Sequence, residues 1–293
     1  MKPFLDALAD AIAAATGTPF APQSTRTAHG GDISDAFTLS DGTRSFFVKT
    51  QPAARLDMFE AEAAGLAELA AAQAVRVPAV VAYGSVSGRA YLVLEALPLG
   101  GRGDAARLGH QLAQQHRVTT ARFGGARDNW IGSTPQPNGW LDDWVAFWRA
   151  RRLGHQLALA AQNGYGGALQ RDGEALLARL DGFFSAYRPP PSLLHGDLWG
   201  GNHGFLDDGT PVIFDPAVYY GDRECDLAMS ELFGGFAPAF HAAYREAWPL
   251  DAGYAVRKHL YNLYHVLNHA NLFGGGYAAQ AQRMIGGLLA ELR

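Results

Sequence analysis

The alternation of apolar and polar residues in the first third of the chain predicts strands together with one helix. Two short β-prone runs meet at the turn Asp41-Gly42, which is typical of a hairpin. A later stretch keeps Phe59, Ala63 and Leu66 on one face, the spacing of a helix. Pro78 confines its strand to a sheet edge or a strand start. The predicted elements are a hairpin at residues 36–39 and 45–49, a helix at 56–72, and strands at 77–81 and 91–95.

Beyond residue 98 the pattern becomes mostly helical. One β-like segment at residues 193–214 interrupts it and contains a hairpin turn at Asp208-Gly209. We therefore predict an α+β chain with a small β-rich N-lobe over residues 1–97 and a larger, mostly helical C-lobe over residues 98–293. The predicted helices span residues 104–117, 140–160, 171–186, 222–233, 237–246, 253–272 and 276–292.

Composition and charge fit a globular enzyme better than a nucleic-acid-binding or membrane protein. The 293 residues carry a formal net charge of −4 and show no Lys/Arg-rich run. No uncharged apolar run reaches the about 18 residues that a bilayer span requires. Asp6 and Asp10 interrupt the apolar N-terminus, which we interpret as a surface helix and not as a targeting signal. The single cysteine, Cys225, excludes an internal disulfide, and we expect a cytoplasmic protein.

The strongest chemical signal is His195-Gly196-Asp197, with Asn202 five residues after the aspartate. Asp215, at the end of the following hairpin, completes an Asp, Asn, Asp set that matches the phosphoryl-transfer layout of protein kinases. Asp197 would face the substrate hydroxyl, while oxygens of Asn202 and Asp215 would reach one Mg²⁺ ion, which prefers hard oxygen ligands. The alternatives are a purely structural turn and a metal-binding His195, but no second His or Cys stands at zinc-like spacing.

Lys49 ends the second hairpin strand, the position of the lysine that contacts nucleotide phosphates in kinases. Glu62, in the helix that follows, would hold the lysine head by an ion pair, and Glu60 is the rival for this role. The alternative interpretation is that these charges are only solvated surface groups. An apolar strand that ends in Lys49 just before a helix favours the phosphate-binding role.

Two backbone segments would complete a nucleotide site. The turn at residues 29–34 contains Gly30, Gly31 and Asp32, and glycines let backbone N–H groups approach phosphates closely. This turn does not match the G-x-G-x-x-G pattern of kinases. At the predicted lobe junction, Glu95 and Leu97 would offer backbone N–H and C=O groups to adenine.

Asp226 opens a predicted helix after the Asp215 loop. It could be a third metal ligand. The better interpretation is a buried carboxylate that accepts backbone N–H groups of the catalytic loop and holds its shape. The neighbouring Cys225 is expected to be a buried, inert thiol.

These segments together resemble the fructosamine/ketosamine 3-kinases, a family related to the aminoglycoside phosphotransferases within the protein-kinase-like fold. The most specific element is Trp199-Gly200-Gly201 between Asp197 and Asn202, because generic phosphotransferases share the Asp and Asn but usually not this tripeptide. The resemblance extends from about Gly30 to the C-terminus. The segments that carry it are LHGDLWGGN at 194–202, FDPAVYYG at 214–221, DNWIG at 128–132 with PQPN at 135–138 and Trp140, ELFGGF at 231–236 and LFGGGY at 272–277.

The resemblance implies a two-lobed kinase that uses ATP and Mg²⁺ to phosphorylate the C3 hydroxyl of a ketosamine, the adduct of a sugar and an amine. The 3-phosphate is then labile, so that the sugar remnant is lost and the amine is freed, which is deglycation. Ribulosamine, erythrulosamine and fructosamine adducts, either small or protein-linked, are the expected acceptors. No nucleic-acid or membrane partner is expected.

When the roles of the family's motif residues are assigned to the matching positions, the resemblance implies that Asp197 is the catalytic base and that Asn202 and Asp215 are the Mg²⁺ ligands. It also favours Glu62 over Glu60 as the partner of Lys49.

The same resemblance sets Trp199 beside the acceptor. Its indole could pack on the C–H face of an open-chain sugar, or it could simply plug the loop. His265, Asn268 and His269 recur on one helix face and could line the acceptor pocket, although core or capping roles suit them equally well.

Three rival functions remain open at this point. The first is the same fold with another acceptor, such as an aminoglycoside or a choline-like alcohol, although the neutral aromatic and Gly-rich signature disfavours a polycation. The second is a non-catalytic nucleotide-binding regulator, which would not need the full set of Lys49, Asp197, Asn202 and Asp215. The third is a metal-dependent hydrolase, for which the chain offers no clustered His/Asp ligand set.

Overall fold

The computed structural model describes residues 2–27 and 34–292. The chain forms two compact units. Unit 1 consists of Met1–Asp104 together with Gly201–Pro216, and unit 2 consists of Ala105–Gly200 together with Ala217–Arg293. Residues 201–216 therefore belong with the N-terminal part of the chain although they lie far from it in the sequence. The lobe boundary between residues 97 and 98 stays a prediction.

Unit 1 contains a five-stranded antiparallel sheet with the order β1-β2-β3-β5-β4. The predicted hairpin is confirmed, because β2 pairs with β3 and Leu39 lies opposite Phe46. The strand predicted at residues 77–81 begins only at Val80, beyond Pro78, which has no N–H for the ladder. The strands are β1 Ser24–Thr27, β2 Asp35–Ser40, β3 Ser45–Pro52, β4 Val80–Val86 and β5 Arg89–Glu95.

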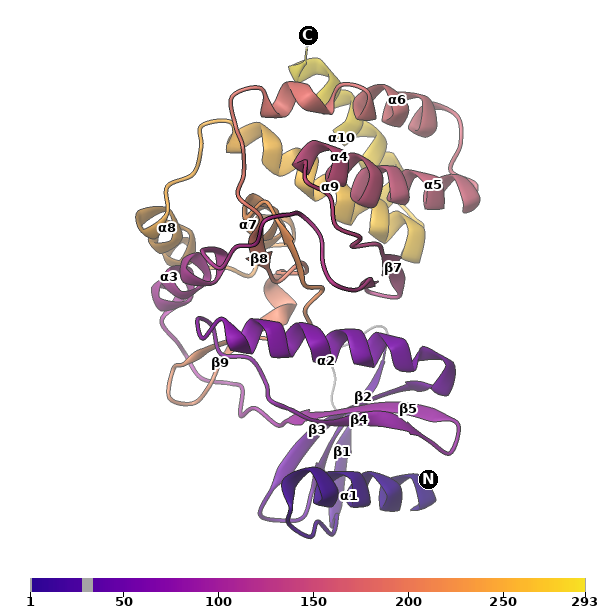
Figure 1. The fold of residues 1–293 in the computed structure, drawn as a ribbon, viewed down its shortest axis with the longest axis vertical. Coiled ribbons are helices and arrows are strands. Elements are labelled where there is room, and N and C mark those ends of the chain that lie inside the picture. Colours follow the sequence, from indigo (N-terminus) through magenta and orange to yellow (C-terminus); the bar gives the residue numbers. More distant parts are fainter. Residues whose placement is uncertain (1, 28–33, 293) are drawn as a thin grey trace. The chain divides into compact units, whose positions relative to one another are not determined.

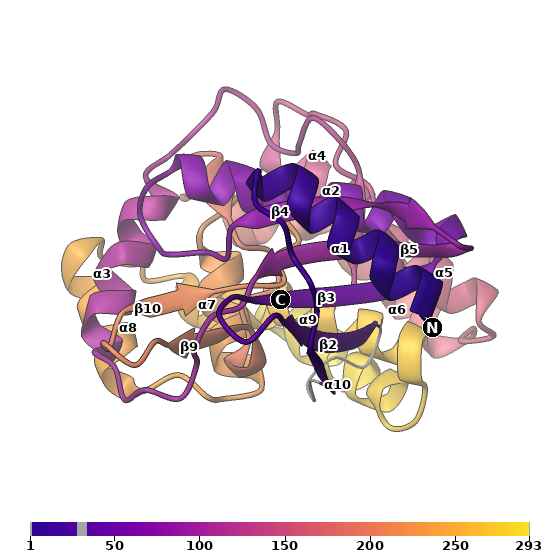
Figure 2. The same cartoon turned by 90° about the horizontal axis from the view of Figure 1, so that it is seen from below.

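Two helices cover the two faces of this sheet (Figures 1 and 2). Helix α1, Lys2–Thr16, confirms the predicted N-terminal helix, and it buries Leu8 and Ile12 completely against the sheet. Helix α2, Leu56–Ala71, matches the predicted helix and lies over the opposite face. Successive strand residues point to opposite faces, so Val48 of β3 packs toward α1 while its neighbour Lys49 points toward α2.

The hairpin of β9, His203–Phe205, and β10, Pro211–Ile213, completes unit 1. Its turn lies where the sequence predicts it, with Gly209 at a φ of +80°, which a glycine adopts without strain. The amide of Ile213 donates to the carbonyl oxygen of Arg76 at 3.0 Å, and Leu99 forms a bridge with Leu206. These backbone contacts join the hairpin to the N-terminal part of the unit.

Unit 2 is mostly helical, as the sequence predicts (Figure 1). Pro238 begins α8, the position at which its missing N–H costs nothing. Helix α9 ends at Phe273, and the next residue, Gly274, has a φ of +66°, which a glycine adopts without strain. The elements are α3 Ala105–His116, β6 Asn129–Ile131, β7 Thr134–Gln136, α4 Trp144–Phe147, α5 Gly154–Gln162, α6 Ala168–Leu177, β8 Ser192–Leu194, β11 Tyr219–Gly221, α7 Glu224–Leu232, α8 Pro238–Ala247, α9 Tyr254–Phe273 and α10 Tyr277–Glu291.

The helix predicted at residues 140–160 is interrupted by a π-helical turn at Trp148–Leu153. This turn brings the carbonyl oxygen of Arg149 to within 2.4 Å of the place that a Cβ on Gly154 would occupy, so only glycine fits there. The helix predicted at 171–186 is likewise shorter: α6 ends at Leu177, and a 3₁₀ turn follows at Leu180–Phe184. The π-helical turn depends on the close contact at Gly154, which apolar spacing alone does not encode.

An aromatic cluster forms the core of unit 2. Trp148 is 1% exposed and meets Tyr261 edge-to-face, with ring centroids 4.9 Å apart. Trp144 lies 5.3 Å from Trp148 and donates its indole N–H to the Tyr261 hydroxyl at 3.2 Å. Edge-to-face aromatic packing contributes to the stability of such a core.

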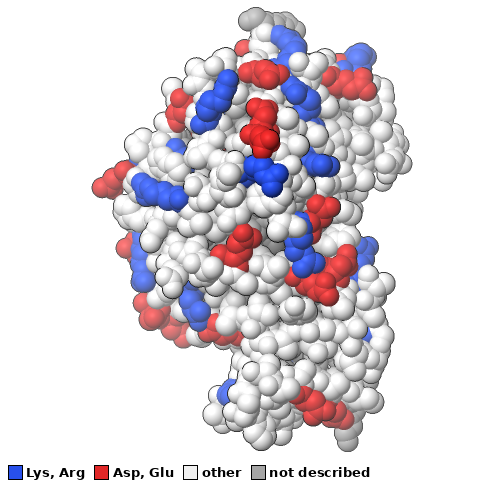
Figure 3. All heavy atoms as spheres, in the orientation of Figure 1, with Lys and Arg blue, Asp and Glu red and all other residues white. Residues whose placement is uncertain are grey.

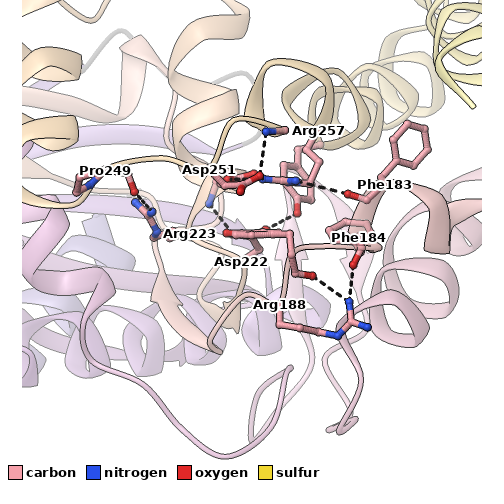
Figure 4. A network of polar contacts seen from close by, with 12 residues as sticks. Phe183, Phe184, Arg188, Asp222, Arg223, Pro249, Asp251 and Arg257 are labelled. Atoms are coloured by element: carbon pink, nitrogen blue, oxygen red, sulfur yellow. Dashed lines mark hydrogen bonds and ion pairs between the residues drawn. The ribbon is translucent and has the colours of Figure 1, made fainter.

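A buried ion pair ties α9 to α7 in unit 2. Arg257 donates to Glu224 through Nε at 2.8 Å and through a terminal nitrogen at 2.9 Å, and both side chains are almost completely buried. Asp251 accepts a further bond from Arg257 at 2.7 Å, and Figure 4 shows Arg257 reaching both Asp251 and the carbonyl oxygen of Phe183. Burial, followed by the charge of Asp222, raises the pKa of Glu224 to about 7, and Arg257 opposes that rise.

Charges of both signs share the surface. On the face in Figure 3, the Lys/Arg and Asp/Glu side chains of the described residues are interspersed. Among the residues that the structure describes, no helix is both long enough and apolar enough to cross a membrane.

Candidate active site

Lys49 of β3 lies between two carboxylates within unit 1. Its ammonium Nζ is 2.7 Å from Glu62 Oε1 on α2 and 2.7 Å from Asp215 Oδ1 after β10. The side chain is buried and points from the sheet toward α2, which carries Glu62. The expected ion pair is therefore present, and Glu62, not Glu60, supplies the carboxylate.

The two carboxylates keep Lys49 charged despite its burial. Burial by itself lowers the pKa of Lys49, but the charges of Asp215 and Glu62 outweigh it and raise this pKa above its ordinary value. Burial also raises the pKa of Glu62, which the lysine charge opposes. The result is a fixed ammonium group that suits the binding of phosphate oxygens.

The backbone of Asp215 is strained. Its φ is +56°, and a left-handed conformation costs a non-glycine residue roughly 1–2 kcal/mol. The following Pro216 disfavours helical conformations at Asp215 still further. Such strain persists only where surrounding contacts hold it, and here the ion pair with Lys49 does so.

Asn202 meets Asp215 at the open end of the β9–β10 hairpin. His203 pairs with Ile213, so the residues just outside this pair, Asn202 and Phe214, come next to each other. The amide of Phe214 donates to the carbonyl oxygen of Asn202 at 3.1 Å, and the Asn202 side-chain nitrogen donates to the carbonyl oxygen of Asp215 at 3.4 Å. The hairpin therefore brings together one amide and one carboxylate, the hard oxygen donors that a Mg²⁺–nucleotide complex takes from a protein.

The loop that carries Asp197 is held by Asp226 within unit 2. The buried carboxylate of Asp226 accepts the backbone N–H groups of His195 at 2.7 Å and Gly196 at 2.9 Å. Gly196 has a φ of +85°, and a Cβ there would lie 2.0 Å from the carbonyl oxygen of Ala217. The geometry therefore fits the structural interpretation of Asp226.

A hydrogen-bond chain continues behind Asp226. His116 at the end of α3 is fully buried, with Nε2 3.1 Å from Asp226 and Nδ1 2.8 Å from the Tyr244 hydroxyl. Arg223 donates to that same hydroxyl at 3.2 Å. Because the Asp226 carboxylate can only accept, His116 Nε2 carries the proton that points to it. Burial acts to raise the pKa of Asp226, but the bond from His116 and the surrounding donors outweigh it and lower this pKa.

The sequence patterns did not predict the series of hydrogen bonds that runs from Arg223 through Tyr244 to His116. His116 stands 110 positions from Asp226, and the only sequence signal was a histidine on the last turn of a predicted helix. Cys225, beside Asp226, is buried, and this burial raises the pKa of its thiol, as expected for an inert cysteine.

Trp199 is 41% exposed and directly follows the buried Leu198 in the loop that carries Asp197. Gly200 after it touches another loop so closely that a Cβ on Gly200 would lie 2.7 Å from the carbonyl oxygen of Gly234. A Cβ on Gly235 would in turn lie 2.7 Å from the Cα of Gly200. The glycines of the two motifs therefore make a close backbone contact beside Trp199.

The structure places His265 and Asn268 in the interior of unit 2, exposed by only 5% and 3%. Asn268 donates to the carbonyl oxygen of Ile131 at 3.3 Å and accepts from Gln156 at 3.2 Å. Burial lowers the pKa of His265 to about 3. These contacts are those of core residues, so the acceptor-lining role of this pair stays a prediction without geometric support. Their neighbour His269 reaches the surface.

The predicted nucleotide-covering residues Gly30, Gly31 and Asp32 lie outside the residues that the structure describes. At the predicted adenine segment, the N–H of Glu95 donates to the carbonyl oxygen of Ala79 at 2.9 Å, so the sheet already uses this donor. The Glu95 side chain pairs with Arg76 at 2.5 Å. The Leu97 carbonyl oxygen accepts the N–H of Leu99 at 2.9 Å. The Glu95 carbonyl and the Leu97 N–H remain the predicted contacts for adenine.

Comparison with known proteins shows the family of this chain. The family model described as fructosamine kinase matches residues 4–291. A Synechocystis protein named "Probable ketoamine kinase" is 48% identical over 95% of this chain and 94% of its own length. The chloroplastic protein-ribulosamine 3-kinase of Arabidopsis thaliana is 42% identical over 90% of this chain and 82% of its own.

Solved structures show the fold directly. The crystal structure of a Haemophilus somnus protein described as a fructosamine-3-kinase superposes with a TM-score of 0.89 and 30% identity, covering 96% of each chain. The aminoglycoside phosphotransferase APH(4)-Ia in complex with ADP and hygromycin B has a TM-score of 0.63 and 15% identity, covering 96% of this chain and 97% of its own, which is a likeness of fold alone. The predicted protein-kinase-like fold, with a small sheet unit and a mostly helical remainder, is confirmed. The chain belongs to the fructosamine kinase family.

Proposed function

We propose that this protein is an ATP- and Mg²⁺-dependent kinase that phosphorylates the C3 hydroxyl of ketosamines and so initiates deglycation. The observation that carries the proposal is the intact phosphoryl-transfer set on a chain of this family: Lys49 paired with Glu62 and Asp215, Asn202 beside Asp215, and Asp197 on a loop fixed by Asp226. The relatives named as ketoamine and ribulosamine kinases support the same acceptor class.

In this proposal Lys49 binds the phosphates of ATP, and Glu62 holds the ammonium in place when Asp215 turns to the metal. Asn202 and Asp215 would hold Mg²⁺ through oxygen atoms. When bound, the ion would neutralise charge on the phosphates during transfer. The structural observation that fits this role is the meeting of an amide and a carboxylate at one end of the β9–β10 hairpin.

Asp197 orients the acceptor hydroxyl and takes up its proton. The hydroxyl oxygen forms a bond to the γ-phosphorus, the bond from that phosphorus to the bridging oxygen of ADP breaks, and ADP leaves with the electron pair. Placement supplies most of the rate enhancement, because the transition state is loose and needs little covalent help. The bonds from Asp226 to His195 and Gly196 support this placement of the loop.

The test is a panel of acceptors with Mg²⁺-ATP and ADP release as the readout: ribulose-lysine, erythrulose-lysine, fructose-lysine, an aminoglycoside and choline. We expect turnover on ketosamines only, and its loss by roughly 10²–10⁴-fold in Asp197→Asn. Turnover on the aminoglycoside or choline would overturn the acceptor class but keep the kinase. Nucleotide binding without turnover on any acceptor would point to a non-catalytic regulator.

A further inference from the structure

An exposed aromatic cluster lies on unit 2 at the ends of α7 and α9. The rings of Phe233 and Phe273 are exposed by 41% and 53%, and the imidazole of His269 lies between them. Its ring centroid is 4.9 Å from Phe233 and 5.4 Å from Phe273, and Tyr277 closes the cluster at 5.1 Å. Large aromatic rings that remain together in water typically mark a binding surface.

The cluster is anchored to the loop that carries the catalytic aspartate. Phe233 is followed by Gly234 and Gly235, which make the close backbone contact with Gly200. Gly200 directly follows Trp199, the exposed indole two residues beyond Asp197. This close approach leaves no room for a Cβ on either side, and it places the segment that follows Phe233 directly against the loop that carries Asp197 within unit 2.

His269 adds a polar group of defined orientation to the cluster. Its Nδ1 lies 2.8 Å from the carbonyl oxygen of His265, which can only accept, so Nδ1 carries a proton. In the neutral ring the lone pair then lies on Nε2. This nitrogen can accept a hydrogen bond from an N–H group that approaches the aromatic faces.

The chemistry of the acceptor supplies such a group. In a ketosamine, only C1 and C2 separate C3 from the amine nitrogen, so a C3 hydroxyl at Asp197 brings this nitrogen into the neighbourhood of the loop. A secondary alkylamine is an ammonium ion at neutral pH, and it carries the apolar arm of the original amine. Aromatic faces attract ammonium ions and also pack against methylene groups.

Resting on the function proposed above, we propose that Phe233, His269 and Phe273 form the amine subsite of the acceptor. The rings bind the ammonium ion and the alkyl arm, and His269 Nε2 accepts an ammonium N–H. The preferred acceptors are adducts of alkylamines such as the lysine side chain, not adducts whose amine is neutral or lacks an apolar arm.

The test compares two acceptors of equal length: N-ribulosyl-butylamine, which is cationic, and its neutral ether analogue, 1-O-butyl-ribulose. We expect the wild type to prefer the amine, and Phe233→Ser/Phe273→Ser to lower kcat/KM for the amine by roughly tenfold to a hundredfold. The ether should lose less, about threefold, because it keeps the packing of its alkyl arm on the rings but has no ammonium charge for a cation–π interaction. Tyr83→Ser, which removes an equally exposed ring from β4 of unit 1, is the matched control and should change neither value.

The subsite would be overturned if the double variant lost equal factors of kcat/KM on both acceptors, or lost no kcat/KM on the amine. Calorimetric binding of the two compounds to wild type and double variant, with ADP present, separates this proposal from the proposed function. If the amine binds to the wild type more tightly than to the double variant but is not turned over, the subsite is supported and the kinase function is refuted. If ketosamines are turned over equally well by the wild type and the double variant, the kinase function is supported and the subsite is refuted. Free ribulosyl-lysine and a ribulosylated peptide, run in parallel, distinguish the small-molecule from the protein-linked source of the arm.

Discussion

Replacing Asp226 by asparagine should weaken the hydrogen bonds that hold the loop carrying Asp197. The native carboxylate is 1% exposed and accepts three hydrogen bonds, from the N–H groups of His195 and Gly196 and from His116. An asparagine keeps one oxygen, so its NH₂ group must face at least one of these donors. The side chain is nearly isosteric, which isolates the change in charge and in acceptor number.

The magnitude follows from these contacts. One donor left without an acceptor in a buried site costs about 1–3 kcal/mol, and the remaining bonds lose the charge assistance that makes them stronger. We expect a loss of about 2–5 kcal/mol in the free energy of unfolding. We also expect kcat to fall by about 10²-fold, because displacement of the loop by 1 Å is enough to disturb the position of Asp197. KM for ATP should change little, since Lys49, Glu62 and Asp215 make their ion pairs within unit 1.

Equilibrium urea denaturation and steady-state kinetics measure the two effects. Asp181→Asn is the matched control: this carboxylate is 76% exposed and pairs with Arg149 at the surface, so its replacement should cost less than about 1 kcal/mol. If Asp226→Asn kept both its kcat and its unfolding free energy within the range of this control, the assignment of Asp226 as the support of the loop would be wrong.

Three further predictions test other contacts. Glu62→Gln should raise KM for ATP and lower kcat/KM roughly tenfold to a hundredfold, as measured by initial rates, because Lys49 loses a charged partner. Arg257→Met should destabilise unit 2 by about 3–5 kcal/mol in urea denaturation, because Glu224 is left buried and unpaired, and Arg257→Met/Glu224→Leu should recover much of this loss. His265 has a native pKa of about 3 against 6.5 when unfolded, so its contribution to stability is complete above pH 6.5 and falls by about 1.4 kcal/mol per pH unit as the pH drops toward 3. Denaturation curves at pH 7 and 5 should show this slope in the wild type and not in His265→Gln.

Each of these predictions can fail in its own way. An unchanged KM for ATP in Glu62→Gln would mean that Asp215 alone positions the lysine. If Arg257→Met/Glu224→Leu were as unstable as Arg257→Met, the loss of stability would come from lost packing against Tyr187. The Arg257 guanidinium lies over this ring at 3.8 Å from its centroid. Equal pH slopes in wild type and His265→Gln would show that the imidazole accepts a proton in the folded state.

Local patterns were sufficient for the elements that carry the chemistry of unit 1. Strand alternation places Lys49 on the face opposite Val48, and the hairpin turn at Gly209 brings Asn202 toward Asp215. Both are short-range consequences of chain geometry, so they can be read from the sequence. The ion pair of Lys49 with Glu62 needs only a strand followed by a helix that covers it.

Features that depend on distant partners could not be read in this way. The bonds of His116 join helices far apart in the sequence, and a histidine at a helix end gives no hint of them. The helical spacing of His265 and Asn268 is the same for a pocket wall and for a core face, and only burial separates the two. The three-residue strands β6, β7 and β11 are too short for a periodic pattern, and the π-helical turn depends on the fit at Gly154.

The composition of unit 1 from two separate stretches of chain has a consequence for biosynthesis. Lys49 precedes Asp215 by 166 residues. At a translation rate of about 5–20 residues per second, roughly 8–30 s pass between the synthesis of the lysine and of its second carboxylate partner. During that interval the five-stranded sheet can fold, but the β9–β10 hairpin that completes unit 1 does not yet exist. Chains that terminate before residue 201 therefore lack both predicted metal ligands, and such truncated products should not compete for ATP in the cell.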